Sequence, residues 1–190
     1  MILLSIPNIL TLLRILLIPV FVLVFYLPFS WAHVTAATIF GIACFTDWLD
    51  GYLARVLKQT SLFGAFLDPI ADKLAVAIAL VLLVGEKHFP FMTLPAAIIV
   101  GREIVISGLR EWMSELGKRA SVAVSYVGKI KTGVQMASLI LLIAFGPEKS
   151  WLGVLGYICL YLAAGLTLWS MFAYIRLAWP WLIEKSSQDE

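Results

Sequence analysis

The sequence predicts an all-α integral membrane protein with six membrane-spanning helices and both termini in the cytoplasm. The first observation behind this prediction is composition: 62% of the 190 residues are hydrophobic and only 14% are charged, whereas soluble domains carry about 25% charged residues. The mean hydropathy of +0.97 agrees. The second observation is that the apolar residues gather in six long runs. The net charge of +2 is too small to indicate a nucleic-acid-binding protein.

Each predicted span is a run of about 20 mostly apolar residues, the length that crosses the bilayer core. The six runs cover residues 7–28, 34–56, 65–85, 91–113, 124–146 and 151–176. Helix breakers separate them at Pro28, Pro90 and Gly146-Pro147. The first run is too long for a cleavable signal and is expected to be retained. Because the runs use most of the chain, residues 1–190 are predicted to form one membrane domain, with any chemistry built from the helices and their ends.

The lysines and arginines predict the orientation of these spans. The connections near 28–33, 86–90 and 147–150 hold only Lys87 and Lys149, and the other basic residues outside the spans lie on the opposite side. Cytoplasmic loops are the ones enriched in lysine and arginine. Both termini are therefore expected inside the cell, together with the segment that joins the second and third runs.

One segment, residues 46–73, concentrates four aspartates in otherwise apolar sequence: Asp47, Asp50, Asp68 and Asp72. A charge at the bilayer centre costs about 2.5–3.5 kcal/mol on insertion scales, so such a cluster needs a compensating cation. Asp47 and Asp50 are three residues apart and share one helix face, as do Asp68 and Asp72, four apart on the next helix. Two such faces in an antiparallel hairpin form a pocket of hard oxygen ligands, which suits Mg²⁺, Mn²⁺ or Ca²⁺.

Small residues accompany these carboxylates and indicate close approach of a ligand or a neighbouring helix. Gly51 and Ala54 lie on the first face and Gly64 on the second. Two divalent ions about 3.5–4 Å apart form a clamp for phosphoryl displacement, so the pattern predicts a phosphate-bearing substrate at the membrane surface. Arg55 is placed to hold a further phosphate oxygen. Pro69 either starts the third helix or kinks it.

The complete pattern resembles the signature of the CDP-alcohol phosphatidyltransferase family. It reads Asp47-x-x-Asp50-Gly51-x-x-Ala54-Arg55, eight residues, then Gly64-x-x-x-Asp68-x-x-x-Asp72. The resemblance extends over most of the chain. Three further segments are similar to the bacterial members of the family that use glycerol 3-phosphate: IPNILTLLRI at the start, GREIVISGLREWMSELGKRASVAVSYVGKIKT in the middle and LTLWSM near the end.

The resemblance implies a homodimer in the bacterial inner membrane, with its active site facing the cytoplasm. The implied reaction moves a phosphatidyl group from CDP-diacylglycerol to sn-glycerol 3-phosphate and releases CMP. Two Mg²⁺ or Mn²⁺ ions are implied, with Asp47, Asp50 and Asp68 binding one, and Asp47, Asp68 and Asp72 helping to bind the other. Asp72 is also the implied general base. The implied CDP-diacylglycerol-binding residues are Asn8, Thr11, Gly51, Arg55 and Ser61.

Glycerol 3-phosphate is an anion and needs a cationic site. Arg110 lies near the cytoplasmic end of the fourth run, and Lys129 and Lys131 open the fifth run from the same side. These three are predicted to bind the acceptor, and ordinary positive-inside charge is the alternative explanation. Arg14, inside the first run, either extends to the interface or reaches the pocket. Arg102 is a further candidate cation for this site, and its role stays open.

Two other functions are open to the same residues. A family member with another acceptor, inositol phosphate or serine, would carry the same signature. A divalent-cation transporter would also use intramembrane aspartates, but it should spread polar residues toward both faces of the membrane. Here the carboxylates crowd one side, which favours the enzyme.

Overall fold

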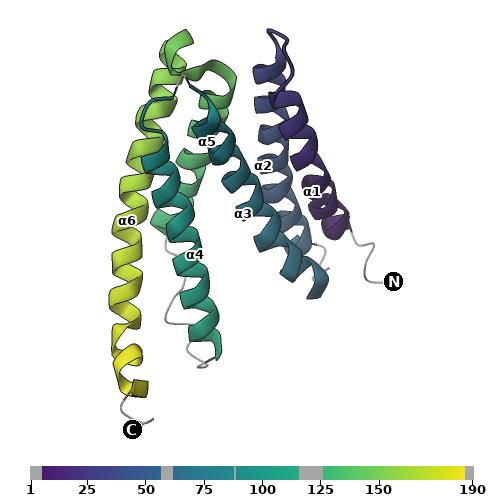
Figure 1. Ribbon diagram of the computed structural model, residues 1–190. Coiled ribbons are helices and arrows are strands. Elements are labelled where there is room, and N and C mark those ends of the chain that lie inside the picture. The colour runs from purple at the N-terminus through teal and green to yellow at the C-terminus, as the bar shows by residue number, and fades with distance from the viewer. Residues whose placement is uncertain (1–5, 57–61, 88, 116–125, 187–190) are drawn as a thin grey trace. The chain divides into compact units, whose positions relative to one another are not determined.

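The computed structural model describes residues 6–56, 62–87, 89–115 and 126–186, and within these ranges it contains six helices and no strand (Figure 1). The all-helical prediction is therefore confirmed for the described part of the chain. Each helix overlaps one predicted apolar run. The helices are α1 (Ile6–Phe25), α2 (Ala32–Val56), α3 (Leu62–Gly85), α4 (Thr93–Glu115), α5 (Tyr126–Lys149) and α6 (Trp151–Ser186).

Among the described residues, three helical segments are long and apolar enough to cross a membrane: Asn8–Phe25, Ala32–Leu53 and Trp151–Arg176. A shorter apolar stretch, Lys131–Gly146, lies in α5. Charged residues interrupt the apolar character of α3 and α4. The structure thus supports a membrane protein, and the count of six spans stays a prediction.

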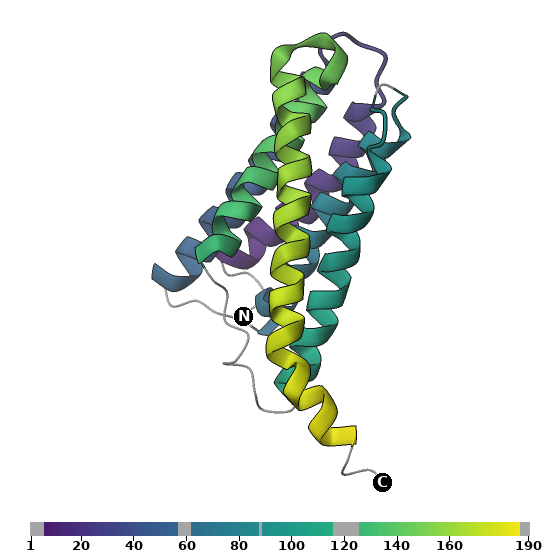
Figure 2. The same ribbon diagram turned by 90° about the vertical axis from the view of Figure 1, so that its left-hand side faces the viewer.

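The chain divides into two compact units, and the first comprises residues 1–90 and 136–157. In this unit α1 packs against both α2 and α3. Figures 1 and 2 show that α1 and α3 run in the same direction and α2 runs antiparallel to both. The rings of Phe21 and Phe40 meet at 5.6 Å between centroids in the α1–α2 core. The start of α1, the end of α2 and the start of α3 consequently lie at one end of this three-helix group.

Two helix irregularities in this unit bear on the sequence predictions. Pro69 lies inside α3, well after its start at Leu62, so it does not occupy the first turn. Gly146 has φ 62° and ψ 160° inside α5. A positive φ favours glycine, which has no Cβ to clash with the backbone, and the predicted break at Gly146-Pro147 is confirmed.

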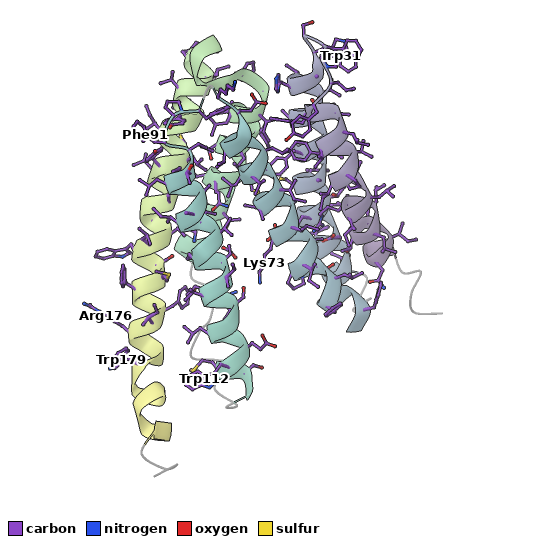
Figure 3. All side chains as sticks on the ribbon, in the orientation of Figure 1. Trp31, Lys73, Phe91, Trp112, Arg176 and Trp179 are labelled. Atoms are coloured by element: carbon purple, nitrogen blue, oxygen red, sulfur yellow. The ribbon has the colours of Figure 1, made fainter. Side chains whose placement is uncertain are left out.

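The second unit comprises residues 91–135 and 158–190. Its core near the end of α4 is formed by Met113, with Leu109, Trp112 and Tyr174 packed around it. At the other end of α4, the Tyr161 hydroxyl donates to the carbonyl of Phe91 at 2.9 Å. Figure 3 shows Arg176 and Trp179 projecting from α6 on the side away from α4. The last helix continues to Ser186, past its predicted end at residue 176.

Candidate active site

A stripe of polar side chains runs along the buried face of α1. Asn8, Thr11 and Arg14 are spaced by three residues and therefore share a face, and they are only 2%, 0% and 1% exposed. Buried polar groups in proteins are nearly always hydrogen-bonded. Since α1 packs against α2 and α3, the stripe is directed at the helices that carry the aspartates.

The contacts of this stripe gather three of the four aspartates. The Arg14 guanidinium bridges two carboxylates of α2: one terminal nitrogen donates to Asp47 Oδ1 at 2.5 Å, and the other donates to Asp50 Oδ2. The Thr11 hydroxyl donates to Asp68 Oδ1 of α3 at 2.6 Å, and Asp50 Oδ2 lies 3.5 Å from the same hydroxyl. Asp47, Asp50 and Asp68 thus converge on α1 from two helices.

Arg14 supplies the compensating cation that the aspartate cluster was predicted to need. Asp50 is 4% exposed, and a buried carboxylate is costly unless it is paired and hydrogen-bonded. The sequence left two positions open for Arg14, the interface and the pocket. The structure places its guanidinium on the carboxylates, with almost no exposure to solvent.

Asp72 lies one turn beyond Asp68 on α3, about 5.4 Å further along the helix. Its side chain is half-buried. The charge of Asp72 lies within electrostatic range of Cys44 of α2, whose sulfur is 3.7 Å from the sulfur of Met136. Asp72 therefore belongs to the same end of the unit as the other three aspartates.

The fit of these residues to divalent ions can be judged from their donor chemistry and spacing. Carboxylate oxygens are the ligands that Mg²⁺ and Mn²⁺ prefer, and Asp47 and Asp50 already hold a cationic group between them. Within the described ranges, no three His, Cys, Asp or Glu side chains are close enough to hold one ion. Carboxylates repel one another unless a cation lies between them, so the residues fit in kind and charge without forming a ready-made ligand set.

The predicted CDP-diacylglycerol-binding residues are only partly described by the structure. Asn8 and Thr11 lie on the buried stripe of α1. Gly51 is exposed on α2 beside Asp50, and a Cβ built on it would meet nothing within 4 Å, so a ligand has room to approach the backbone there. Ser61 and the side chain of Arg55 lie outside the described residues.

A second group of charges lies in the other unit. Lys131 is 4% exposed, and its Nζ has no hydrogen-bond partner among the residues that the structure describes. Arg102, Glu103 and Arg110 of α4 lie within electrostatic range of Lys131. A buried ammonium without a partner is costly, so this position suits an anionic ligand.

The neighbours of Lys131 differ in their own contacts. Arg102 donates to Glu103 Oε1 at 2.6 Å and has a buried Nε without a partner in the described part of the chain. Arg110 is exposed, and its guanidinium lies 5.8 Å from the centre of the Tyr174 ring. The side chain of Lys129 is outside the described residues.

Comparison with known proteins identifies the family of this chain. Residues 4–172 match the family model described as CDP-alcohol phosphatidyltransferase. The chain belongs to the CDP-alcohol phosphatidyltransferase family. The family predicted from the aspartate signature is therefore confirmed.

Three relatives in this family are named CDP-diacylglycerol–glycerol-3-phosphate 3-phosphatidyltransferase. The protein of Pseudomonas fluorescens is 55% identical over 179 residues, which cover 94% of this chain and 92% of the relative. Those of Yersinia enterocolitica and Pectobacterium atrosepticum are each 56% identical, over 181 and 180 residues respectively, covering 95% of this chain and 98% of each relative.

Two site features of this CDP-alcohol phosphatidyltransferase were not assigned from its sequence. The first is the pairing of Arg14 with Asp47 and Asp50. The second is the position of Arg102, which lies within electrostatic range of Lys131. The three-residue spacing of Asn8, Thr11 and Arg14 is a signal for the first, because a polar stripe in an otherwise apolar helix must face polar partners. Arg102 has no comparable signal, because an arginine beside a glutamate also occurs on solvated helices.

Proposed function

We propose that this CDP-alcohol phosphatidyltransferase transfers the phosphatidyl group of CDP-diacylglycerol to sn-glycerol 3-phosphate, giving phosphatidylglycerophosphate and CMP. Relatives at 55–56% identity over nearly the whole chain carry the name of this reaction. The observation in the structure that best supports the proposal is the convergence of Asp47, Asp50 and Asp68 on α1. The reaction needs several carboxylates at one place, beside a phosphate-bearing substrate.

Asp47, Asp50, Asp68 and Asp72 are proposed to hold two Mg²⁺ or Mn²⁺ ions. When bound, such ions neutralise negative charge on the reacting phosphate and its leaving group. The donor chemistry of the four side chains supports this assignment. Bound ions would also offset the free-energy cost of placing four carboxylates in an apolar protein.

Asp72 is proposed as the general base that accepts the proton of the acceptor hydroxyl. A carboxylate within hydrogen-bond reach of the hydroxyl can take that proton as the new bond to phosphorus forms. CMP leaves with the electron pair of the broken bond. Asp72 is suited to this role because it stands one helical turn from Asp68 on α3, beside the carboxylates proposed to hold the ions.

The nucleotide end of CDP-diacylglycerol is proposed to contact Asn8, Thr11, Gly51, Arg55 and Ser61. The open space above Gly51 supports this placement, since a side chain there would oppose close approach of the pyrophosphate. The acyl chains of the substrate are in lipid and its cytidine is soluble. A site at the end of a group of apolar helices can bind the cytidine while the acyl chains stay in the lipid.

The phosphate of glycerol 3-phosphate is proposed to bind Lys131, with Arg110 and Lys129. Lys131 is the best supported of the three, because its ammonium is buried and no protein partner is described for it. An anionic phosphate would supply both the missing hydrogen bonds and the missing countercharge.

We further propose six membrane spans with both termini in the cytoplasm, a homodimer, and a place in the bacterial inner membrane with the active site on the cytoplasmic side. The distribution of lysine and arginine supports the orientation. Trp31 and Trp151 are exposed next to helix ends, as residues of an interfacial belt would be. The homodimer is supported by the family resemblance.

An acceptor screen tests the proposed reaction. Purified protein, CDP-diacylglycerol and Mg²⁺ are offered glycerol 3-phosphate, inositol phosphate or serine in separate reactions, and CMP release is measured. We expect rapid CMP release with glycerol 3-phosphate only, abolished by excess chelator and by Asp68→Ala. Faster release with another acceptor would contradict the substrate assignment, and full activity in chelator would contradict the metal assignment.

A further inference from the structure

We infer that Arg14 is a positioning residue for the proposed metal site: its guanidinium holds the Asp47 and Asp50 carboxylates close to one another, so that less rearrangement is needed when a divalent cation binds. This inference rests on the proposed function, because it concerns the ions that the function requires. It assigns a task to a side chain of α1 that does not itself resemble a metal ligand.

The geometry of the contact suits positioning. Asp47 and Asp50 are three residues apart on α2, and the two terminal nitrogens of Arg14 reach one oxygen of each. A guanidinium is planar and presents its donors in a rigid fork, so one group bonded to both carboxylates sets their separation and tilt. A carboxylate has about four lone-pair positions, and a single contact from Arg14 leaves capacity for an ion.

The burial of Arg14 ties it to these two carboxylates. The side chain is 1% exposed, so water does not compete for its donors. Its Nε has no partner among the described residues, which leaves the terminal nitrogens to hold the guanidinium in place. Hydrogen-bonding partners of metal-ligating side chains orient those ligands, and losing one such partner costs about 10–100-fold in metal affinity or activity.

The positive charge of Arg14 also changes the net charge of the proposed metal site. Four ionised aspartates carry a charge of −4, and Arg14 reduces it to −3. Two divalent ions would bring the site to +1, a charge that would attract a pyrophosphate, whereas without Arg14 the site with two ions would be neutral. Repulsion between Arg14 and an arriving ion acts in the opposite direction, so the net effect of losing Arg14 is expected at the lower end of the range, about tenfold.

The test measures Mn²⁺ binding to the full-length protein in detergent, by the electron paramagnetic resonance signal of free Mn²⁺. Arg14→Gln removes the charge and most of the fork, and Arg14→Lys keeps the charge without the fork. Arg176→Gln is the matched control, because it removes one charge from an exposed position of α6 (Figure 3). We expect a dissociation constant about tenfold larger in both Arg14 variants and unchanged in the control.

Size-exclusion chromatography and circular dichroism establish whether each variant is folded. If Arg14→Gln aggregates, the Mn²⁺ affinity of Arg14→Lys alone tests the inference. Equal or tighter Mn²⁺ binding in a folded Arg14 variant would overturn the inference and leave the proposed function intact. Absence of saturable Mn²⁺ binding in the wild type would overturn the inference together with the proposed metal dependence.

Discussion

Replacing Lys131 by methionine should make the protein more stable and a poorer enzyme. Lys131 is 4% exposed, and its Nζ has no partner among the described side chains and backbone groups. The charges within electrostatic range include two arginines and one glutamate. Methionine keeps most of the length and apolar contacts of the lysine stem and removes the ammonium.

The size of the effect follows from the burial. Leaving a buried polar group without a hydrogen bond costs about 1–3 kcal/mol, and more for a charged group. Lys131→Met should therefore raise the free energy of unfolding by about 1–3 kcal/mol in the absence of substrate. Binding of the acceptor should stabilise the wild type much more than the variant. At a hundred times its dissociation constant, a ligand stabilises the protein that binds it by about 2.7 kcal/mol.

The assay is chemical unfolding in detergent, followed by circular dichroism, with and without glycerol 3-phosphate. The variant should be the more stable protein without the acceptor. Saturating acceptor should stabilise the wild type by about 2.7 kcal/mol and the variant by much less. In steady-state kinetics the KM for glycerol 3-phosphate should rise at least about tenfold, equivalent to about 1.4 kcal/mol, while the KM for CDP-diacylglycerol stays the same.

Arg176→Met is the control for loss of one positive charge, since Arg176 is exposed on α6 (Figure 3). It should change neither stability nor KM. The reasoning would be refuted if Lys131→Met were less stable than the wild type without acceptor, or if glycerol 3-phosphate stabilised both proteins equally. The first result would mean that the ammonium has a favourable partner in the protein, and the second that the acceptor binds elsewhere.

Two further predictions concern the aspartate site. Asp72→Asn should keep CDP-diacylglycerol binding and lose at least about a hundredfold in turnover, because a general base contributes about 10²–10⁴-fold; substantial rescue of the rate by extra Mn²⁺ would show instead that Asp72 acts only as a ligand. Thr11→Val should lower the free energy of unfolding by about 1.5–3 kcal/mol, the contribution of a hydrogen bond to a charged group. Thr38→Val, which removes an exposed bond to the carbonyl of Val34, should cost clearly less, and equal losses would argue against a special role for the bond to Asp68.

The parts of the fold and site that were predictable from sequence depend on local spacing. Bilayer thickness dictates the length of an apolar run, so all six helices were found, including the break at Gly146. Asp47 and Asp50 were correctly placed on one helix face, where Arg14 contacts both, because a three-residue spacing determines a face. The family followed from the same spacings.

Features that depend on which helices meet were not predictable in this way. The sequence left Arg14 with two possible positions, because spacing along α1 does not say which helix its polar stripe faces. Contact with α2 decides the matter. Similarly, the four carboxylates were expected to form one pocket, yet their positions depend on their partners: the Arg14 guanidinium holds Asp47 and Asp50, and the Thr11 hydroxyl donates to Asp68. Pro69 was undecided because a proline is compatible with the first turn of a helix and also with a kink inside one, and α3 starts at Leu62, seven residues earlier.

The pairing of Arg14 also has a consequence for biogenesis. The guanidinium is translated 33 and 36 residues before the two carboxylates that bind it, a delay of about 2–7 s at about 5–20 residues per second. During that interval α1 holds an arginine whose partners do not yet exist. Its apolar remainder, the most hydrophobic of the three candidate spans, has to offset about 2.5–3.5 kcal/mol of insertion cost. Apolar residues of α1 that make no contact in the folded protein would therefore still be under selection. Their hydrophobicity would be needed for the insertion of α1 into the membrane before α2 is synthesised.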